Sequence, residues 1–233
     1  MPARLLALSI DALDPEHQAG FWSAALGWEV DGTDLVAPGI GFRVAFRQVD
    51  APKAERNRIH IDVTTTSLDD QRETVERLLA LGASHLDVGQ GPDDDHAVLA
   101  DPEGNELCIL APGNRFLDGC GRLGAINCDG LRATGVFWSE ALGLPLVWDQ
   151  DEETAIRHPD PGGPMITWSG PPLLPKPAKN RLHLDLAPVD GDLQAEVERL
   201  LALGATRVDV GQGDAAWAVL ADPDDNELCV YPR

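Results

Sequence analysis

The chain is short of positive charge. Its 233 residues include 18 lysines and arginines against 39 aspartates and glutamates, which gives a formal net charge of −21. A protein that binds nucleic acid needs a basic surface to neutralise phosphates, and no basic stripe is visible along this chain. The acidic charge also discourages docking to anionic membranes. We therefore expect neither nucleic acid nor a membrane among its partners.

Long apolar runs are also missing, and cysteine is scarce. Residues 1–6 form too short an apolar stretch for a signal peptide, and no run approaches the roughly 20 apolar residues of a membrane-spanning helix. The four cysteines, Cys108, Cys120, Cys128 and Cys229, do not have the spacing of a disulfide framework. These absences favour a cytoplasmic protein with reduced thiols.

What the chain does contain is a long internal repeat. The hexapeptide Asn-Arg-Ile-His-Ile-Asp at 57–62 returns as Asn-Arg-Leu-His-Leu-Asp at 180–185, and residues 75–83 return letter for letter at 197–205. Gly-Gln-Gly follows in both copies, and so does an Asp-Pro-x-x-Asn-Glu-Leu-Cys block. The period is far longer than the roughly 20–50 residues of a solenoid repeat. It predicts two similar domains, 1–113 and 121–233, that pack together.

Each copy reads as two units of the same kind. In copy 1, a short strand at 5–10 precedes a helix that has Asp14 as its N-cap and stops at Gly27, and short strands follow. The second unit has a strand at 58–64, a helix that begins at Ser67, and further strands. This order predicts an α+β fold in which helices cover one face of curved, mostly antiparallel sheets.

The ordered motifs carry a family resemblance. An early helix ends in Phe-Trp-x-x-x-Leu-Gly, and the Asn-Arg-[Ile/Leu]-His-[Ile/Leu]-Asp strand, a Leu-Gly-Ala helix end and the final Asp-Pro hairpin follow, twice over. This set resembles the glyoxalase/bleomycin-resistance/extradiol-dioxygenase (vicinal oxygen chelate) superfamily, most closely its actinobacterial glyoxalase-like branch. The resemblance covers nearly the whole chain. It implies two tandem domains, each of two βαβββ modules that form a U-shaped open barrel around a ligand cleft.

The resemblance also implies where a metal would bind. Members that hold a divalent ion use His, Gln and Glu side chains on the cleft floor. His60 and His183 match the usual histidine on the first strand of the second module. Cys108 and Cys229 stand where the last strand usually carries glutamate, and Ala7 stands where the first strand usually offers histidine.

The remaining ligand position adds little. The strand before the hexapeptide of copy 1 offers only Gln48. Because a catalytic zinc takes three protein ligands and Mg²⁺ wants several oxygens, the retained ligands indicate a degenerate metal site. One alternative is a divalent metal within a domain, with His60 and Cys108 as candidate ligands in copy 1 and His183 and Cys229 in copy 2. Another is that the cysteines are small buried hydrophobic residues.

The histidines are also candidates for acid–base catalysis. His60 and Asp62 alternate onto one face of their strand, and His183 and Asp185 do the same. Each aspartate could hold its imidazole in one tautomer, so that the pair moves a proton. The alternatives are that each histidine is a structural residue, or that it donates a hydrogen bond to a bound ligand.

Other residues are candidates for ligand binding. The later strands of copy 2 carry Trp168 and Trp217, whose rings could stack on a planar ligand. His96 is the counterpart of Trp217 in copy 1. Glu106 and its repeat Glu227 alternate onto the same strand face as the two cysteines.

The arginines of the hexapeptides have a structural interpretation. We expect Arg58 and Arg181 to bond loop carbonyls or acidic turns and so to fix the connection between modules. A role as an anion clamp is the alternative.

Two functions fit these features. The first is a glyoxalase-like lyase, isomerase or oxygenase that acts on a small oxygenated or aromatic molecule. The alternative is a non-catalytic protein that sequesters such a molecule, as bleomycin-resistance relatives do. Both use the same cleft, and the fold does not choose between them. In either case we expect a small-molecule ligand and a monomer or homodimer of tandem domains.

Overall fold

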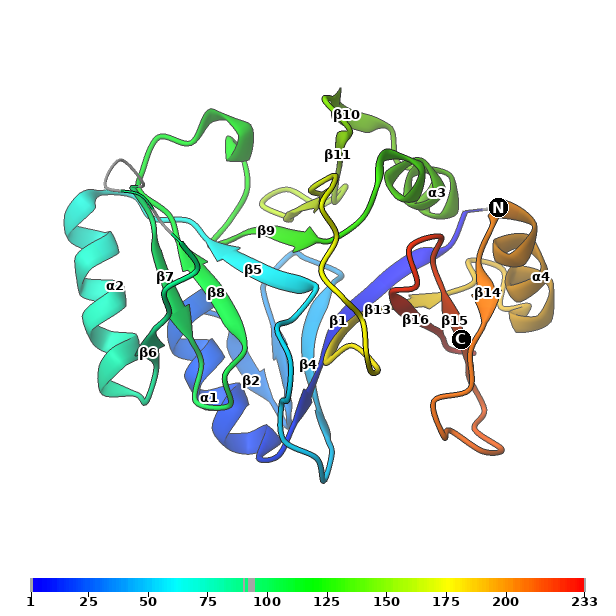
Figure 1. Cartoon of the computed structure of the whole chain (residues 1–233), viewed down its shortest axis with the longest axis horizontal. Helices are drawn as coiled ribbons and strands as arrows, with labels where there is room; N and C mark the ends of the chain where they lie inside the picture. Colours follow the sequence, from blue (N-terminus) through cyan, green and yellow to red (C-terminus); the bar gives the residue numbers. More distant parts are fainter. Residues whose placement is uncertain (1, 90, 92–94, 233) are drawn as a thin grey trace.

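The computed structural model describes residues 2–89, 91 and 95–232 (Figure 1). Gln90, the middle residue of the first Gly-Gln-Gly block, lies outside these residues. Within the described ranges, no helix has the length and apolar composition needed to cross a membrane.

The described residues form four modules, each with one strand, one helix and three further strands. Module 1 consists of β1 (Arg4–Ala12), α1 (Pro15–Leu26), β2 (Glu29–Asp31), β3 (Asp34–Val36) and β4 (Arg43–Gln48). Module 2 consists of β5 (Ile59–Val63), α2 (Leu68–Ala80), β6 (Ser84–His85), β7 (Ala97–Ala100) and β8 (Glu106–Ile109). Module 3 follows a short 3-10 helix, η1 (Arg115–Leu117), and consists of β9 (Leu123–Cys128), α3 (Arg132–Leu142), β10 (Leu146–Gln150), β11 (Glu153–Arg157) and β12 (Met165–Trp168). Module 4 consists of β13 (Leu182–Ala187), α4 (Leu193–Leu203), β14 (Thr206–Arg207), β15 (Ala218–Ala221) and β16 (Glu227–Val230).

The modules pair across the two copies. Sheet A has the order β14-β15-β16-β13-β1-β4-β3-β2, so it joins module 4 to module 1. Sheet B has the order β10-β11-β12-β9-β5-β8-β7-β6, so it joins module 3 to module 2. The pairing is parallel between the first and last strands of each module and antiparallel elsewhere. The predicted α+β fold of βαβββ modules in open sheets is confirmed, but each sheet joins modules of different copies and not, as predicted, the two modules of one domain.

The helices begin and end where the sequence predicts. The Asp14 side chain accepts a hydrogen bond from the His17 N–H, and Gly27 ends α1 in the left-handed conformation. At the start of α2, the hydroxyl of Ser67 accepts from the Asp70 N–H at 3.0 Å. These local signals are sufficient to place the helices on the chain.

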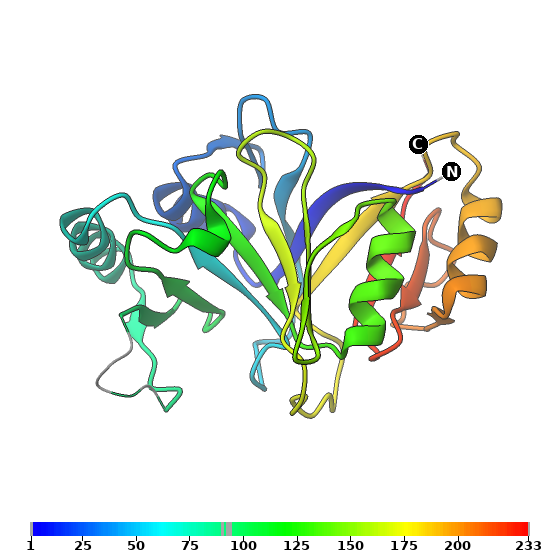
Figure 2. The same cartoon turned by 90° about the horizontal axis from the view of Figure 1, so that it is seen from above.

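Both copies share one hydrophobic core. A single cluster of buried apolar residues includes Leu8 of β1, Trp22 of α1, Leu78 of α2, Trp138 of α3 and Leu200 of α4. Helix α1 packs on α2 within copy 1, and α3 packs on α4 within copy 2. Figure 2 shows α2 and α4 at opposite ends of the molecule with the strands between them. The helices therefore cover one face of each sheet and leave the other face for a site.

The Asp-Pro turns fasten each helix pair to its sheets. The carboxylate of Asp101 accepts hydrogen bonds from the Trp22 indole at 3.0 Å and from the Asn105 backbone. Asp222 accepts in the same way from the Trp138 indole at 3.0 Å. Burial raises the pKa of Asp222 to about 6, although its hydrogen bonds oppose the rise. The duplicated turn is thus a structural motif that joins one module to the next.

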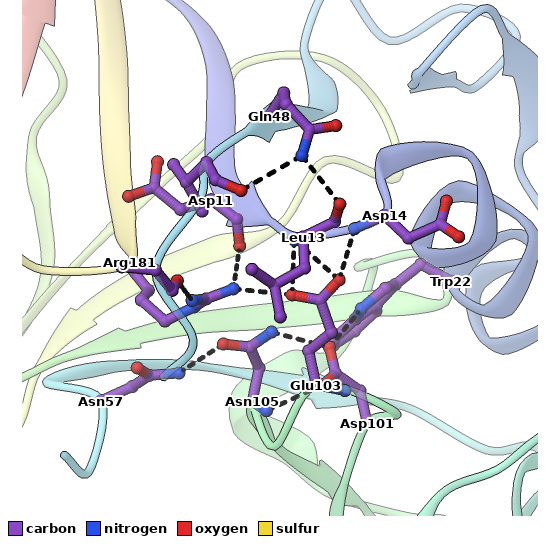
Figure 3. Close-up of polar contacts among 12 residues, drawn as sticks. Asp11, Leu13, Asp14, Trp22, Gln48, Asn57, Asp101, Glu103, Asn105 and Arg181 are labelled. Carbon is purple, nitrogen blue, oxygen red and sulfur yellow. Dashed lines mark hydrogen bonds and ion pairs between the residues drawn. The ribbon is translucent and has the colours of Figure 1, made fainter. Parts of the chain in front are cut away.

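A second polar network ties the copies together (Figure 3). The Nη2 group of Arg181 donates to the backbone oxygen of Asp11 and to the Glu103 carboxylate, both at 2.7 Å. The same carboxylate accepts the backbone N–H groups of Leu13 and Asp14. A residue of copy 2 therefore holds the start of α1 and a turn of copy 1 together.

The corresponding network of the other junction uses Arg58. Its Nη1 group donates to the Asp224 carbonyl at 2.6 Å, and the Asp224 carboxylate accepts from the Leu131 N–H and the Thr134 hydroxyl. The structural role predicted for the two arginines is confirmed.

We expect Arg181→Ala to lower the free energy of unfolding by about 3 kcal/mol, because Glu103 would stay buried without its cationic partner. Denaturant unfolding followed by circular dichroism measures the loss. Arg72→Ala is the control, since its ion pair with Asp69 is exposed on α2, and it should cost less than about 1 kcal/mol. Equal losses in the two variants would contradict a junction role for Arg181.

Candidate functional site

Two sets of three side chains meet on the faces of the sheets that the helices leave free. They are the sheet A trio of His183, Asp185 and Cys229 and the sheet B trio of His60, Asp62 and Cys108. In each trio, one ligand atom per residue lies within 4.8 Å of the others. The histidine and aspartate alternate along one strand, and the cysteine lies beside the aspartate in the parallel ladder. The structure thus brings the predicted histidines, aspartates and cysteines together.

The sheet A trio is buried and is completed by the other copy. The hydroxyl of Ser9 on β1 donates to Asp185 Oδ2 at 2.5 Å, and His183 Nε2 lies 3.3 Å from Asp185 Oδ1. The side chain of His183 is only 6% exposed. Asp185 Oδ1 and His183 Nδ1 have no hydrogen-bond partner among the described residues. His183 Nδ1 is therefore left without a protein partner among these residues, whereas Asp185 Oδ1 faces His183 Nε2.

Opposing effects act on the imidazole of the sheet A trio. Burial lowers the pKa of His183, but hydrogen bonds and charge from Asp185 and Cys229 outweigh it and raise this pKa to about 9. The proximity of Asp185 and Cys229 therefore favours the charged form of His183.

The sheet B trio is looser and more exposed. His60 Nε2 lies 3.7 Å from Asp62 Oδ1, and the His60 side chain is 38% exposed. Asn127 of β9 takes the place of Ser9 and donates to Asp62 Oδ2 at 2.6 Å. Burial raises the pKa of Asp62, and burial together with the charge of Asp62 raises the pKa of the Cys108 thiol. The Cys108 thiol is thus held in the protonated form.

The donor set of the sheet A trio fits zinc. Zinc accepts imidazole, carboxylate and thiolate, and its catalytic sites use three protein ligands with one open position. Two ligands about 2.05 Å from a tetrahedral zinc lie roughly 3.3 Å apart, which matches the separation of 3.3 Å between His183 Nε2 and Asp185 Oδ1. The hydrogen bond from Ser9 to the other oxygen would orient the carboxylate, as outer partners of metal ligands do. A hard cation that prefers an all-oxygen shell does not fit this set.

A cavity of about 540 Å³ lies beside the sheet A trio. Its polar lining comes from Arg4, Asp34, Arg43, Arg47, Asp185 and Tyr231. These residues come from β1, β3 and β4 of copy 1 and from the region of β13 and β16 of copy 2. The cavity is thus another feature that neither copy builds alone.

The cavity has an excess of positive charge. Asp34 forms ion pairs with Arg43 at 3.0 Å and with Arg47 at 2.8 Å, and its side chain is mostly buried. Arg4 adds a third guanidinium group. In a chain with a net charge of −21, three arginines around one cavity favour an anionic ligand.

The predicted position of Trp168 is wrong. Its side chain is 1% exposed, and its ring stacks on Trp138 in the core between sheet B and α3. Trp168 pairs with Cys128 in the ladder and points to the same helix-covered side. A shift of one residue in a strand reverses the face of every side chain, and the sequence did not determine that phase.

The other predicted ligand-binding residues lie around the sites in different ways. Trp217 is 37% exposed and stacks on the ring of Tyr231, and Tyr231 lines the cavity. His96 is half-buried, and its charge opposes the rise that burial causes in the pKa of Asp62. Glu106 and Glu227 lie outside the trios, in ion pairs with Lys53 and Lys176 respectively. Their role in ligand binding stays a prediction.

Several residues of the site were not predicted. Ser9 lies opposite His183. It is two positions beyond Ala7, and Ala7 is the position at which the family pattern places a ligand. Gln48 bonds the backbone oxygens of Leu13 and Val49 and does not reach a trio. Arg43 and Arg47 could have been found from the sequence, because they are four residues apart on one strand and an even spacing places both charges on one face.

Comparisons with known proteins agree with this architecture. The model of the glyoxalase-like domain matches residues 7–110 and again residues 125–231. The solved structure of glyoxalase I from Zea mays has a TM-score of 0.62 and 16% identity, over 98% of this chain and 92% of that chain. A candidate dioxygenase from Bacillus subtilis has a TM-score of 0.60 and 13% identity, over 97% and 84%. A search of curated proteins finds no match.

At these identities the solved structures show a shared fold and no more, whereas the family model covers most of the sequence in two copies. The resemblance to the glyoxalase/bleomycin-resistance/extradiol-dioxygenase superfamily is therefore confirmed, whereas the actinobacterial branch stays a prediction. The chain belongs to the glyoxalase-like domain family and carries two copies of that domain in tandem.

Proposed function

We propose that this protein is a glyoxalase-like enzyme whose sheet A cleft binds a small oxygenated organic acid and moves a proton at Asp185. One observation carries the proposal. The cavity that gathers three arginines also reaches Asp185, whose Oδ1 atom has no hydrogen-bond partner among the described residues. Anion recognition and a buried carboxylate thus meet at one cavity.

The arginines would bind the acid group of the ligand. A guanidinium group offers several N–H donors in a plane, which suits the two oxygens of a carboxylate. Asp34 holds the Arg43 and Arg47 side chains in place, so less conformational freedom is lost when the ligand binds. The Tyr231 hydroxyl adds a donor or acceptor to the same wall.

Asp185 would accept the proton. Ser9 holds its Oδ2 atom, which leaves Oδ1 for a C–H or O–H group beside the ligand carbonyl. His183 lies 3.3 Å from that oxygen and would hold the carboxylate in place. Proton transfer beside a carbonyl is the common step of isomerases and lyases.

The sheet A trio would hold a zinc ion through His183, Asp185 and Cys229. When bound, zinc would polarise a carbonyl oxygen or lower the pKa of a water molecule. Asp185 would then be a zinc ligand, so proton acceptance by Asp185 applies to the protein without zinc. The arginines keep the same role with or without it, because they bind the acid group at a distance from the trio.

A second candidate function is sequestration without chemistry. The observation that favours it is the burial of His183, which is only 6% exposed and so offers a ligand little direct contact. A sequestering protein needs only the arginine-lined cavity. The two functions differ in turnover and agree in binding.

We expect Asp185→Asn to reduce kcat/KM by about 100- to 10,000-fold, because the amide keeps the shape and loses the proton acceptor. Hydrogen–deuterium exchange into a panel of small 2-oxo and 2-hydroxy acids, followed by NMR, gives the readout. Asp62→Asn in the sheet B trio is the matched control and should keep the activity. If neither the variants nor the unaltered protein catalyses the exchange but all of them bind the acid, the result favours sequestration.

We expect Arg43→Ala and Arg47→Ala each to weaken binding of the acid about 10- to 100-fold, the value of a charged hydrogen bond. Calorimetric titration with the best acid of the same panel measures this. Arg132→Ala removes an equal charge from an exposed ion pair on α3 and should leave the affinity unchanged. An equal loss in all three variants would indicate a general charge effect.

We expect the full chain to retain about one zinc ion after dialysis against zinc, with Cys229→Ser losing it and Cys108→Ser keeping it. The sheet A trio should win because it is better shielded and its ligand atoms are closer. Elemental analysis gives the stoichiometry, and cobalt substitution shows thiolate ligation by its absorption. Failure of the unaltered protein to retain zinc would contradict the fit.

A further inference from the structure

The segment that connects the two copies crosses the cleft of sheet B. We call residues 110–122, between β8 and β9, the connecting segment. It is fixed at its far end, where the Gly121 N–H donates to the Gly162 carbonyl at 2.8 Å. The Thr64 hydroxyl donates to the Gly121 carbonyl at 2.9 Å, and Arg157 donates to the Cys120 sulfur at 3.4 Å. Bonds to both modules of sheet B thus hold the segment over the sheet.

The connecting segment places an apolar plug on this face. Leu117 of η1 is 5% exposed and packs on Ala125, Ala155 and Met165 of β9, β11 and β12. Leu110, Phe116 and Cys120 of the segment pack around this cluster. Since Ala125 pairs with Asp62 in the sheet, the cluster lies directly beside the sheet B trio.

Two further contacts fit the plug to the sheet. The Phe116 ring meets Trp148 of β10 edge to face, with the ring centroids 5.8 Å apart. A β-carbon at Gly124 would lie 3.1 Å from Leu117 Cδ1 and 2.5 Å from Thr64 Cγ2, so only glycine permits this close approach.

The positions of sheet A that correspond to this apolar cluster of sheet B line the open cavity. By their places in the two ladders, Arg43 and Asp34 of sheet A correspond to Met165 and Ala155 of sheet B. The cavity in sheet A is therefore polar at the positions where sheet B is apolar and covered. Charged side chains would be costly under Leu117, because burial would remove them from water.

We propose that the connecting segment fills the part of the sheet B cleft that corresponds to the cavity of sheet A and closes that part, so that only the cleft of sheet A takes a ligand. His60, whose side chain is 38% exposed, lies beside the closed part. The segment is covalently tethered, and its high effective concentration disfavours a competing free ligand. Closure holds whatever sheet A binds, whereas a stoichiometry of one ligand per chain rests on the proposed function.

A pair of cysteine variants at equivalent positions tests closure without any ligand. Asp34→Cys would lie in the cleft of sheet A and Ala155→Cys under the plug. Both are treated with a maleimide reagent in the full chain, and peptide mass spectrometry separates the new thiol from the four native ones. We expect Ala155→Cys to react at least tenfold more slowly. Equal rates would overturn closure, because the plug would then be open in solution.

A second variant identifies the plug itself. Adding Leu117→Ala to Ala155→Cys should raise the labelling rate to within about threefold of Asp34→Cys, and circular dichroism reports whether the fold is kept. An unchanged slow rate in a folded protein would overturn the role of Leu117. If the double variant does not fold, the comparison of the two single variants still decides. Loss of exchange activity in Asp185→Asn is separate from both results, so the proposed function and closure can fail independently.

Discussion

The structure depends on two strand pairings that join the copies, β1 with β13 and β5 with β9. Each module is a four-stranded sheet whose first strand would otherwise have an open edge, and the strand that covers it comes from the other copy. The same pairings set Ser9 opposite His183 and Asn127 opposite His60. Each trio therefore receives its fixing hydrogen bond from the other copy, and a site is a property of the two copies together.

The repeated hexapeptide serves the junction as well as the cleft. Its arginine reaches across to the other copy, as Arg181 does to Glu103, while the histidine and aspartate that follow face the cleft. The aspartate of the Asp-Pro turn joins modules 1 and 2 of its own copy, because Asp101 accepts from the Trp22 indole and from the Asn105 N–H. Repetition in the sequence therefore reports architecture first, and the site occupies only two of the six positions.

Local signals made the fold predictable. Caps such as Asp14 and Ser67 and the strand alternation depend on neighbours in the sequence, and they gave the helices and the strand–helix–strands order. The family resemblance supplied the βαβββ modules and the positions of the two histidines. The cleft was less predictable because it depends on pairing between distant strands. That pairing selects Ser9 over Ala7, and the phase of one strand decides that Trp168 points to the core.

The two clefts contain trios of the same residue types, but the surroundings of the trios differ. Water reaches His60, which is 38% exposed, and weakens its coupling to Asp62, whereas His183 is 6% exposed and interacts with Asp185 in a medium that screens charge poorly. The connecting segment adds an apolar cover on one side only, and the residues beneath it are apolar in turn. Two copies of one trio thus meet different dielectric and steric conditions. The two features on which the proposed function rests, the arginine-lined cavity and the buried trio, lie together in sheet A.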